Sequence, residues 1–188
     1  YISSSGDVYF SIESFQKYGT LTNLKLDKLI QSKRVRSDEY SSDIIQDFAL
    51  WKAYKPSDGN VYWQSPWGKG RPGWHIECSA MAMNLLGNSI DIHCGGVDNK
   101  FPHHENEIAQ SECFSQSKFV NYWLHSDFLL VDGEKMSKSK GNFYTLNDII
   151  KKGMSVEEFR YMIFSAHYRS KINFSLKRIN NAKKAITR

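Results

Sequence analysis

The chain has 188 residues, with 25 Lys and Arg against 20 Asp and Glu, so its formal net charge is +5. Apolar residues make up 40% and aromatic residues 14%, which is typical of a globular protein and excludes disordered, collagen-like and coiled-coil chains. No apolar run approaches the ~18 residues of a membrane-spanning helix, which excludes an integral membrane protein. Three cysteines are too few for a disulfide scaffold and, with no secretory signal visible, predict a cytoplasmic location. Because the chain starts at Tyr1 without Met, we expect it to be a piece of a longer protein.

The N-terminal third is irregular in pattern. The alternating residues 7–10 (DVYF) predict a strand, and the polar residues 33–47 predict a surface loop. Residues 63–73 hold two Pro and three Gly. We expect a structured loop there, because Trp63 and Trp67 are costly to leave in water.

From Trp74 onward the pattern is typical of an α/β fold. Apolar residues at helical spacing predict a helix over residues 75–86, which stops at Gly87. The elements predicted after it alternate between strand and helix: a strand at residues 90–94, a helix from Pro102 to about Ser117, and strands at 122–125 and 128–131. Such alternation implies parallel strands joined by crossovers.

Helix starts and an excess of positive charge mark the C-terminal third. Thr145 with Asp148, and Ser155 with Glu158, have capping-box spacing and predict two helix starts. Residues 169–188 hold seven basic residues and no acidic one, so the other 168 residues carry 18 basic and 20 acidic groups. Such a tail predicts either contact with a polyanion or a solvated helix face.

A possible metal site lies in the segment FPHHENE (residues 101–107). His103 and Glu107 are four residues apart and therefore share one helix face. With Cys78 from the preceding helix they form a thiolate, imidazole and carboxylate set that suits Zn²⁺. The alternative is an ordinary His–Glu ion pair at the surface and a small core cysteine.

A possible phosphate-binding loop follows the strand at residues 128–131. Residues 135–142 (KMSKSKGN) place three Lys and two Ser within six positions, and such side chains suit the oxygens of a polyphosphate. An ordinary basic surface loop is the alternative. Met136 argues against it, because an apolar side chain in the middle of the loop needs a place to pack.

Three motifs together resemble the cysteinyl-tRNA synthetases, which are class I aminoacyl-tRNA synthetases. They are GRPGWHIECSAM (residues 70–81), DIHCGGVDNKFPHHENEIAQSE (residues 91–112) and GEKMSKSKGN (residues 133–142). GDVYF, DFALWKAYKP and SAHYRSKINFS are also similar, so the resemblance covers nearly the whole chain. It implies Cys78, His103 and Glu107 as ligands of one zinc ion per chain, with a fourth protein ligand outside this chain.

The resemblance also implies a nucleotide and amino-acid site. Lys138 is similar to the ATP-binding lysine of the family and Lys135 lies in the same loop, so both are expected to be catalytic. Trp74 resembles the aromatic wall of the amino-acid pocket. The segment expected beside the adenylate supplies four residues, His93, Gly95, Gly96 and Asp98. Cys94 replaces a glycine that is usual in the family, and its side chain would either crowd the nucleotide or point into the sheet.

The fold implied by the resemblance is the second half of a Rossmann-like nucleotide-binding fold. Residues 1–62 would be a connective peptide, residues 63–132 the second half of the catalytic domain, and residues 133–188 the KMSKS loop and a helical stem-contact region. The half with the HIGH motif and the anticodon-binding domain would lie outside this chain. Because these parts are missing, we expect the fragment alone to be inactive. We expect the protein to be a monomer.

The reaction implied is the activation of L-cysteine by ATP with Mg²⁺, followed by transfer of the cysteinyl group to the 3′ end of tRNA-Cys. Zinc would select the substrate thiolate over the hydroxyl of serine, which a pocket that relies on fit discriminates by only ~1–3 kcal/mol. No general base is needed, so His75 and His104 are expected to pack or to form hydrogen bonds. Two rival functions are a cysteine-activating amino-sugar ligase of mycothiol synthesis and a non-catalytic zinc-binding RNA module.

Overall fold

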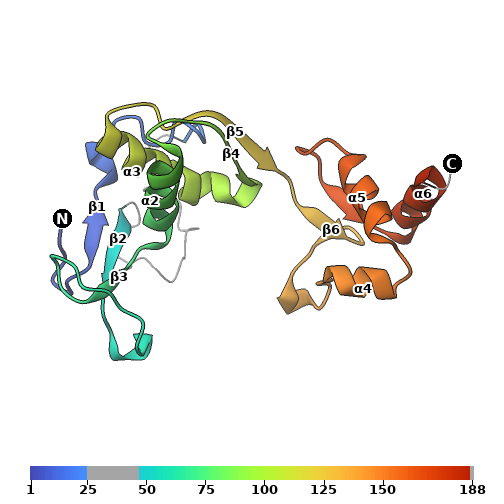
Figure 1. Cartoon of the computed structure of the whole chain (residues 1–188), viewed down its shortest axis with the longest axis horizontal. Coiled ribbons are helices and arrows are strands. Elements are labelled where there is room, and N and C mark those ends of the chain that lie inside the picture. The colour runs from blue at the N-terminus through green and yellow to red at the C-terminus, as the bar shows by residue number, and fades with distance from the viewer. Residues whose placement is uncertain (25–46, 187–188) are drawn as a thin grey trace. The chain divides into compact units, whose positions relative to one another are not determined.

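The computed structural model describes residues 1–24 and 47–186, which form a mixed α/β fold (Figure 1). The chain divides into two compact units. Unit 1 comprises Tyr1–His93 and Asp98–Trp123, and unit 2 comprises Cys94–Val97 and Leu124–Arg188. The mixed α/β class is confirmed, and within the described residues no helix has the length and apolar character to cross a membrane. The predicted surface loop at 33–47 falls outside the described residues except for Asp47, which is buried.

An antiparallel three-stranded sheet occupies one side of unit 1. Its strands β1 (Val8–Phe10), β2 (Phe48–Ala53) and β3 (Gly70–Pro72) follow the order β1-β2-β3. The strand predicted at residues 7–10 is confirmed. A side chain at Gly70 would collide with the Lys52 carbonyl and the Trp51 indole, so only glycine fits where β3 meets β2.

Two helices of unit 1 pack side by side, as Figure 1 shows. Helix α2 (Trp74–Leu86) confirms the predicted helix and its stop at Gly87, whose φ is 92°. Helix α3 (Glu105–Ser115) begins later than predicted, because Phe101 is extended and the chain makes a π-helical turn over Lys100–His104. A residue that precedes proline disfavours helical angles, which accounts for the late start.

Two strands, β4 (Ile90–Gly96) and β5 (Val120–Ser126), pair with each other and run through residues of both units. In unit 1 the buried Ile90, Phe119 and Val120 form one core cluster. A second cluster joins α3 to the N-terminal segment through Ile12, Tyr18, Phe48 and Ala109. The packing around these clusters fixes the positions of α2 and α3, which carry the predicted metal ligands.

The described residues of unit 2 form a small sheet of order β7-β6-β8 and the α-helices α4, α5 and α6. Strand β6 (Leu129–Val131) pairs antiparallel with β7 (Glu134–Lys135) and parallel with β8 (Ile172–Phe174). The helices are α4 (Leu146–Lys151), α5 (Val156–Phe164) and α6 (Leu176–Ile186). Both predicted capping boxes are confirmed, at the starts of α4 and α5.

Candidate functional site

The three predicted metal ligands meet in unit 1. Cys78 comes from α2, His103 from the turn before α3, and Glu107 from the first turn of α3. One ligand atom of each lies within 4.8 Å of the others. Nε2 of His103 is 2.9 Å from Oε1 of Glu107, so the helical spacing does bring these two groups together. The three side chains thus converge from two packed helices.

The surroundings of Glu107 fit a bound cation. Glu107 is fully buried, and neither of its carboxylate oxygens has a hydrogen-bond partner within the described part of the chain. Nε2 of His103 is close to Oε1, but the pair does not meet the geometry of a hydrogen bond. A buried carboxylate without donors is costly unless a cation compensates it. A thiol, an imidazole and a carboxylate are the donors that zinc takes, so these residues could hold this ion.

The charge state of Cys78 depends on whether a cation lies beside it. Burial raises the pKa of the Cys78 thiol, and the carboxylates of Glu107 and Glu77 raise it further. Without a cation the thiol therefore stays protonated. A cation beside Glu107 would reverse this effect and favour the thiolate, which is the form that binds metal.

His75 contacts the ring nitrogen of His103 that does not face Glu107. Nδ1 of His75 lies 2.8 Å from Nδ1 of His103. Burial and, to a smaller extent, the nearby His103 lower the pKa of His75 to about 3, so His75 is neutral. Where Nε2 of His103 binds a cation, the proton of this imidazole must lie on Nδ1, and Nδ1 of a neutral His75 can accept it. In that tautomer His75 orients the ring so that Nε2 faces Glu107.

Trp74 forms a wall beside the same imidazole. Its ring stacks on His103 with centroids 4.8 Å apart and an angle of 24°. The indole is 47% exposed, so one part of it supports the ligand and the rest stays accessible. This placement suits the expected role of Trp74 at the edge of an amino-acid pocket.

A second group of potential ligands shares Glu107. Atoms of His93, His104 and Glu107 lie within 4.8 Å of one another, and Nε2 of His93 is 3.5 Å from Oε2 of Glu107. Sequence reasoning placed His93 beside a nucleotide and missed its approach to Glu107. No local spacing could reveal it, because His93 is on β4 and Glu107 is on α3. His104 is buried against Trp123, as expected for a packing residue.

The other residues predicted beside the adenylate are spread along a short stretch of chain. Gly95 and Gly96 end β4, and Asp98 lies in the 3-10 turn Val97–Asn99. The carbonyl of Gly95 accepts a hydrogen bond from the Ser126 hydroxyl of β5 at 3.4 Å. The side chain of Cys94 is exposed. Nucleotide binding by these residues stays a prediction.

The loop formed by residues 135–142, here called the KMSKS loop, belongs to unit 2. Nζ of Lys135 lies 3.7 Å from the centre of the Phe128 ring, and Nζ of Lys138 lies 5.5 Å from that of Phe143. Both lysines are exposed. Met136 packs against the core of unit 2, which confirms that it needs a place to pack.

Asn142 fixes the shape of the KMSKS loop, a role that sequence reasoning missed. Its side-chain oxygen accepts the amide N–H of Ser137 at 2.8 Å, and its nitrogen donates to the carbonyl of Lys135 at 3.2 Å. Gly141 takes the left-handed conformation, with φ of 67°, which suits glycine at this turn. Asn142 thus joins the two ends of the loop, in which Lys135 and Lys138 are exposed.

A mixed α/β fold with a largely buried thiol–imidazole–carboxylate set and a KMSKS loop has the features of a class I aminoacyl-tRNA synthetase catalytic domain. Residues 1–184 match the family described as tRNA synthetases class I (C) catalytic domain, and the chain belongs to this family. A protein of Brachyspira hyodysenteriae named cysteine–tRNA ligase is 59% identical over 187 residues, which cover 98% of this chain and 40% of the relative. One of Chlamydia muridarum with the same name is 57% identical over 189 residues, covering 100% of this chain and 40% of the relative. The chain thus spans about 40% of the length of these curated relatives.

Proposed function

We propose that the protein containing this chain is a cysteine–tRNA ligase that uses ATP and carries one zinc ion in unit 1. The buried carboxylate of Glu107, which has no hydrogen-bond donor within the described residues, is the observation that carries the zinc assignment. Family membership and the names of the relatives support the reaction. The basic C-terminal residues favour tRNA over an amino sugar as the acceptor, because tRNA is a polyanion.

In the first step, a carboxylate oxygen of cysteine attacks the α-phosphorus of ATP. The new O–P bond gives cysteinyl-adenylate, and the bond to pyrophosphate breaks. Lys138 and Lys135 would neutralise the charge that develops on the leaving pyrophosphate, with Mg²⁺ bound to the ATP. His93, Gly95, Gly96 and Asp98 would contact the adenylate.

In the second step, a hydroxyl of the terminal ribose of tRNA attacks the carbonyl carbon of the adenylate. The bond to AMP breaks, and the hydroxyl proton passes to the departing phosphate or to water. The substrate carboxylate is the nucleophile of the first step and AMP is a good leaving group in the second. Neither step needs a protein nucleophile, so catalysis is mostly positioning and charge stabilisation. We assign the buried His75 to the orientation of His103 and not to proton transfer.

Cys78, His103 and Glu107 would hold the zinc ion, with a fourth ligand from outside this chain. When bound there, zinc supplies a soft acceptor that binds a thiolate much better than a hydroxyl. Trp74 would close the pocket beside it. This donor set gives the ligase a way to reject serine that does not depend on the small difference in size.

The proposal assigns residues 1–62 to a connective peptide, 63–132 to the second half of a Rossmann-like domain, and 133–188 to the KMSKS loop and stem-contact region. The full-length protein should catalyse cysteine-dependent exchange of pyrophosphate into ATP and should charge tRNA-Cys. Transfer to an amino sugar in place of tRNA would contradict the proposal, as would the absence of exchange. The 188-residue fragment alone should show no exchange.

A further inference from the structure

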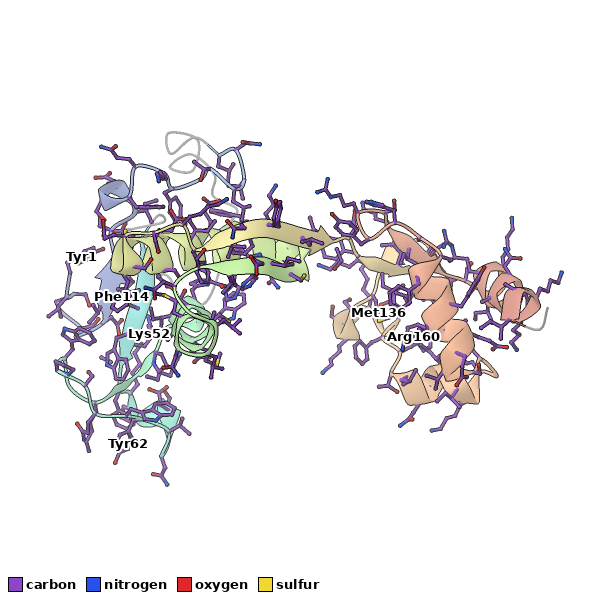
Figure 2. The ribbon with its side chains drawn as sticks, turned by 45° about the horizontal axis from the view of Figure 1, so that its top comes forward. Tyr1, Lys52, Tyr62, Phe114, Met136 and Arg160 are labelled. Carbon is purple, nitrogen blue, oxygen red and sulfur yellow. The ribbon has the colours of Figure 1, made fainter. Side chains whose placement is uncertain are left out.

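The connection between β2 and β3 is a loop of residues 54–69, here called the aromatic arm. Figure 2 shows Tyr62 at the far end of the arm, beyond the sheet of unit 1. Four aromatic side chains of the arm are exposed: Tyr54 by 37%, Tyr62 by 38%, Trp63 by 56% and Trp67 by 48%. None of them belongs to a core cluster of the described residues. Large exposed rings gathered on one short loop are typical of a contact surface.

Hydrogen bonds hold the arm in one conformation. Trp63 and Gly70 exchange two backbone hydrogen bonds, of 2.8 and 3.0 Å, and the Tyr54 amide donates to the Lys69 carbonyl at 2.9 Å. At the bend, the Ser65 hydroxyl donates to the Gly68 carbonyl at 2.7 Å. The rings are therefore presented by an ordered backbone, and little entropy would be lost when a partner binds them.

The charge of the arm and of the strand that follows it is positive. Residues 54–71 carry the basic Lys55, Lys69 and Arg71 and a single acid, Asp58. The Asp58 carboxylate accepts the Lys55 amide N–H at 2.8 Å, so it is already engaged. Nζ of Lys69 lies 4.6 Å from the centre of the Tyr62 ring, which places a cation beside an exposed aromatic face. Rings interleaved with cations suit a strand of nucleotides, whose bases stack and whose phosphates are negative.

The side chains of the arm favour a nucleic acid over an apolar protein surface. Val61 is the only aliphatic side chain larger than alanine or proline among residues 54–69. The rings pack in pairs, Tyr54 against Tyr62 with centroids 5.2 Å apart and Trp67 against Trp51 at 6.4 Å. Tyr54, Tyr62 and Trp67 each stay more than a third exposed in these pairs.

We propose that the aromatic arm is a stacking surface for the unpaired 3′-terminal nucleotides of tRNA, with Lys55 and Lys69 beside their phosphates. This inference rests on the proposed ligase function. The arm and the metal centre belong to the same unit, because β3 ends at Pro72 and α2, which carries Cys78, begins at Trp74. The 3′ end of tRNA must reach that unit to receive cysteine, so its unpaired nucleotides are the part of tRNA that the arm fits.

The test compares two reactions of the full-length protein carrying Trp63→Ala or Tyr62→Ala. Pyrophosphate exchange does not involve tRNA and should stay unchanged. The kcat/KM for charging tRNA should fall about tenfold, as expected for the loss of one stacked base. Trp63→Phe should restore most of the charging, because it keeps an aromatic face. Phe114→Ala removes a ring of α3 that is 81% exposed, and this control should leave both reactions unchanged.

Binding of a shortened tRNA identifies the nucleotides involved. The wild-type protein and Trp63→Ala should bind tRNA without its unpaired 3′ nucleotides equally well, and should differ in binding the intact molecule. Equal charging by wild type and Trp63→Ala would overturn the inference, as would a loss of exchange in the variant, which would show that the ring supports the fold. A wild-type protein that charges no tRNA would instead overturn the proposed function.

Discussion

The two groups of predicted site residues lie in opposite environments. In unit 1, His103 and Glu107 are buried and Cys78 is half-buried, whereas Lys135 and Lys138 of unit 2 are exposed. A metal centre needs ligands that are fixed in place and shielded from competing water. Lysines that receive the phosphates of a substrate must stay hydrated and accessible until it arrives. Under the proposed function, the buried set would select an atom of the substrate, and the exposed lysines would receive its charged phosphates.

The largest effect is expected from Cys78→Ala, which removes one of the three predicted metal ligands of unit 1. Loss of one of three protein ligands should lower the zinc affinity of the full-length protein by more than ~100-fold, beyond the effect known for outer residues. Cys113→Ala is the matched control, because Cys113 is a half-buried thiol of α3 outside the ligand set. Zinc content is measured by elemental analysis. Equal content in the two variants would contradict the ligand assignment.

Lys138→Ala tests the exposed group. Cysteine-dependent pyrophosphate exchange should fall ~100-fold, because a charge that stabilises the transition state is lost. Zinc content should not change. Lys140→Ala is the control, since Lys140 already forms an exposed ion pair with Glu134 at 2.9 Å. Our account of the loop fails if both variants keep full exchange activity.

His75→Ala tests the metal centre without changing a ligand. It keeps all three ligands and removes the imidazole that contacts His103. Zinc affinity should fall ~10-fold, which is at the lower end for residues that hold a metal ligand. Competition with a chelator measures this affinity. His167→Ala replaces an exposed histidine of unit 2 and should have no effect. An unchanged affinity in His75→Ala would show that His103 is oriented by other groups.

The smallest effect is expected at Asp7, the residue before β1. Burial by itself would raise the pKa of Asp7, but the amide of Ala53 and the ammonium of Lys52 outweigh it and keep the pKa below its usual value. The ionised carboxylate therefore stabilises unit 1 above the pKa of the unfolded chain, and this contribution is lost as the pH falls through the folded pKa.

Asp7→Asn should thus weaken local stability at neutral pH by ~1 kcal/mol, the net value of a hydrogen bond. Hydrogen exchange of the Ala53 amide, which donates to Asp7 at 2.7 Å, measures the change. The difference from wild type should shrink at low pH. Asp91→Asn, at an exposed carboxylate, is the control. A difference that stays constant with pH would exclude the ionised carboxylate as its source.

Local patterns predicted the parts of this chain that depend on local structure. Helical spacing predicted α2 and the proximity of His103 and Glu107. The starts of α4 and α5 could be predicted because the two residues of a capping box lie three positions apart. The donor types of Cys78 and the pair indicated a zinc site as one of two alternatives, and the motifs that resemble the synthetase family favoured it.

Contacts set by tertiary packing could not be predicted in this way. The approach of His93 to Glu107 joins a strand to a helix, and the Nδ1 contact of His75 with His103 joins two helical segments 28 residues apart. The loop at residues 63–73 was expected to be structured, but its tryptophans were expected to avoid water, whereas Trp63 and Trp67 are about half exposed. Only the fold shows which way such side chains face.

Binding of cysteine and of serine to the full-length protein, with its zinc present and after its removal, tests the central claim most directly. Equilibrium dialysis gives both dissociation constants without requiring catalysis. We predict that removal of zinc weakens cysteine binding strongly and serine binding little, so that the preference for cysteine falls at least ~10-fold toward what a pocket achieves by fit alone. The same preference with and without the ion would contradict the account.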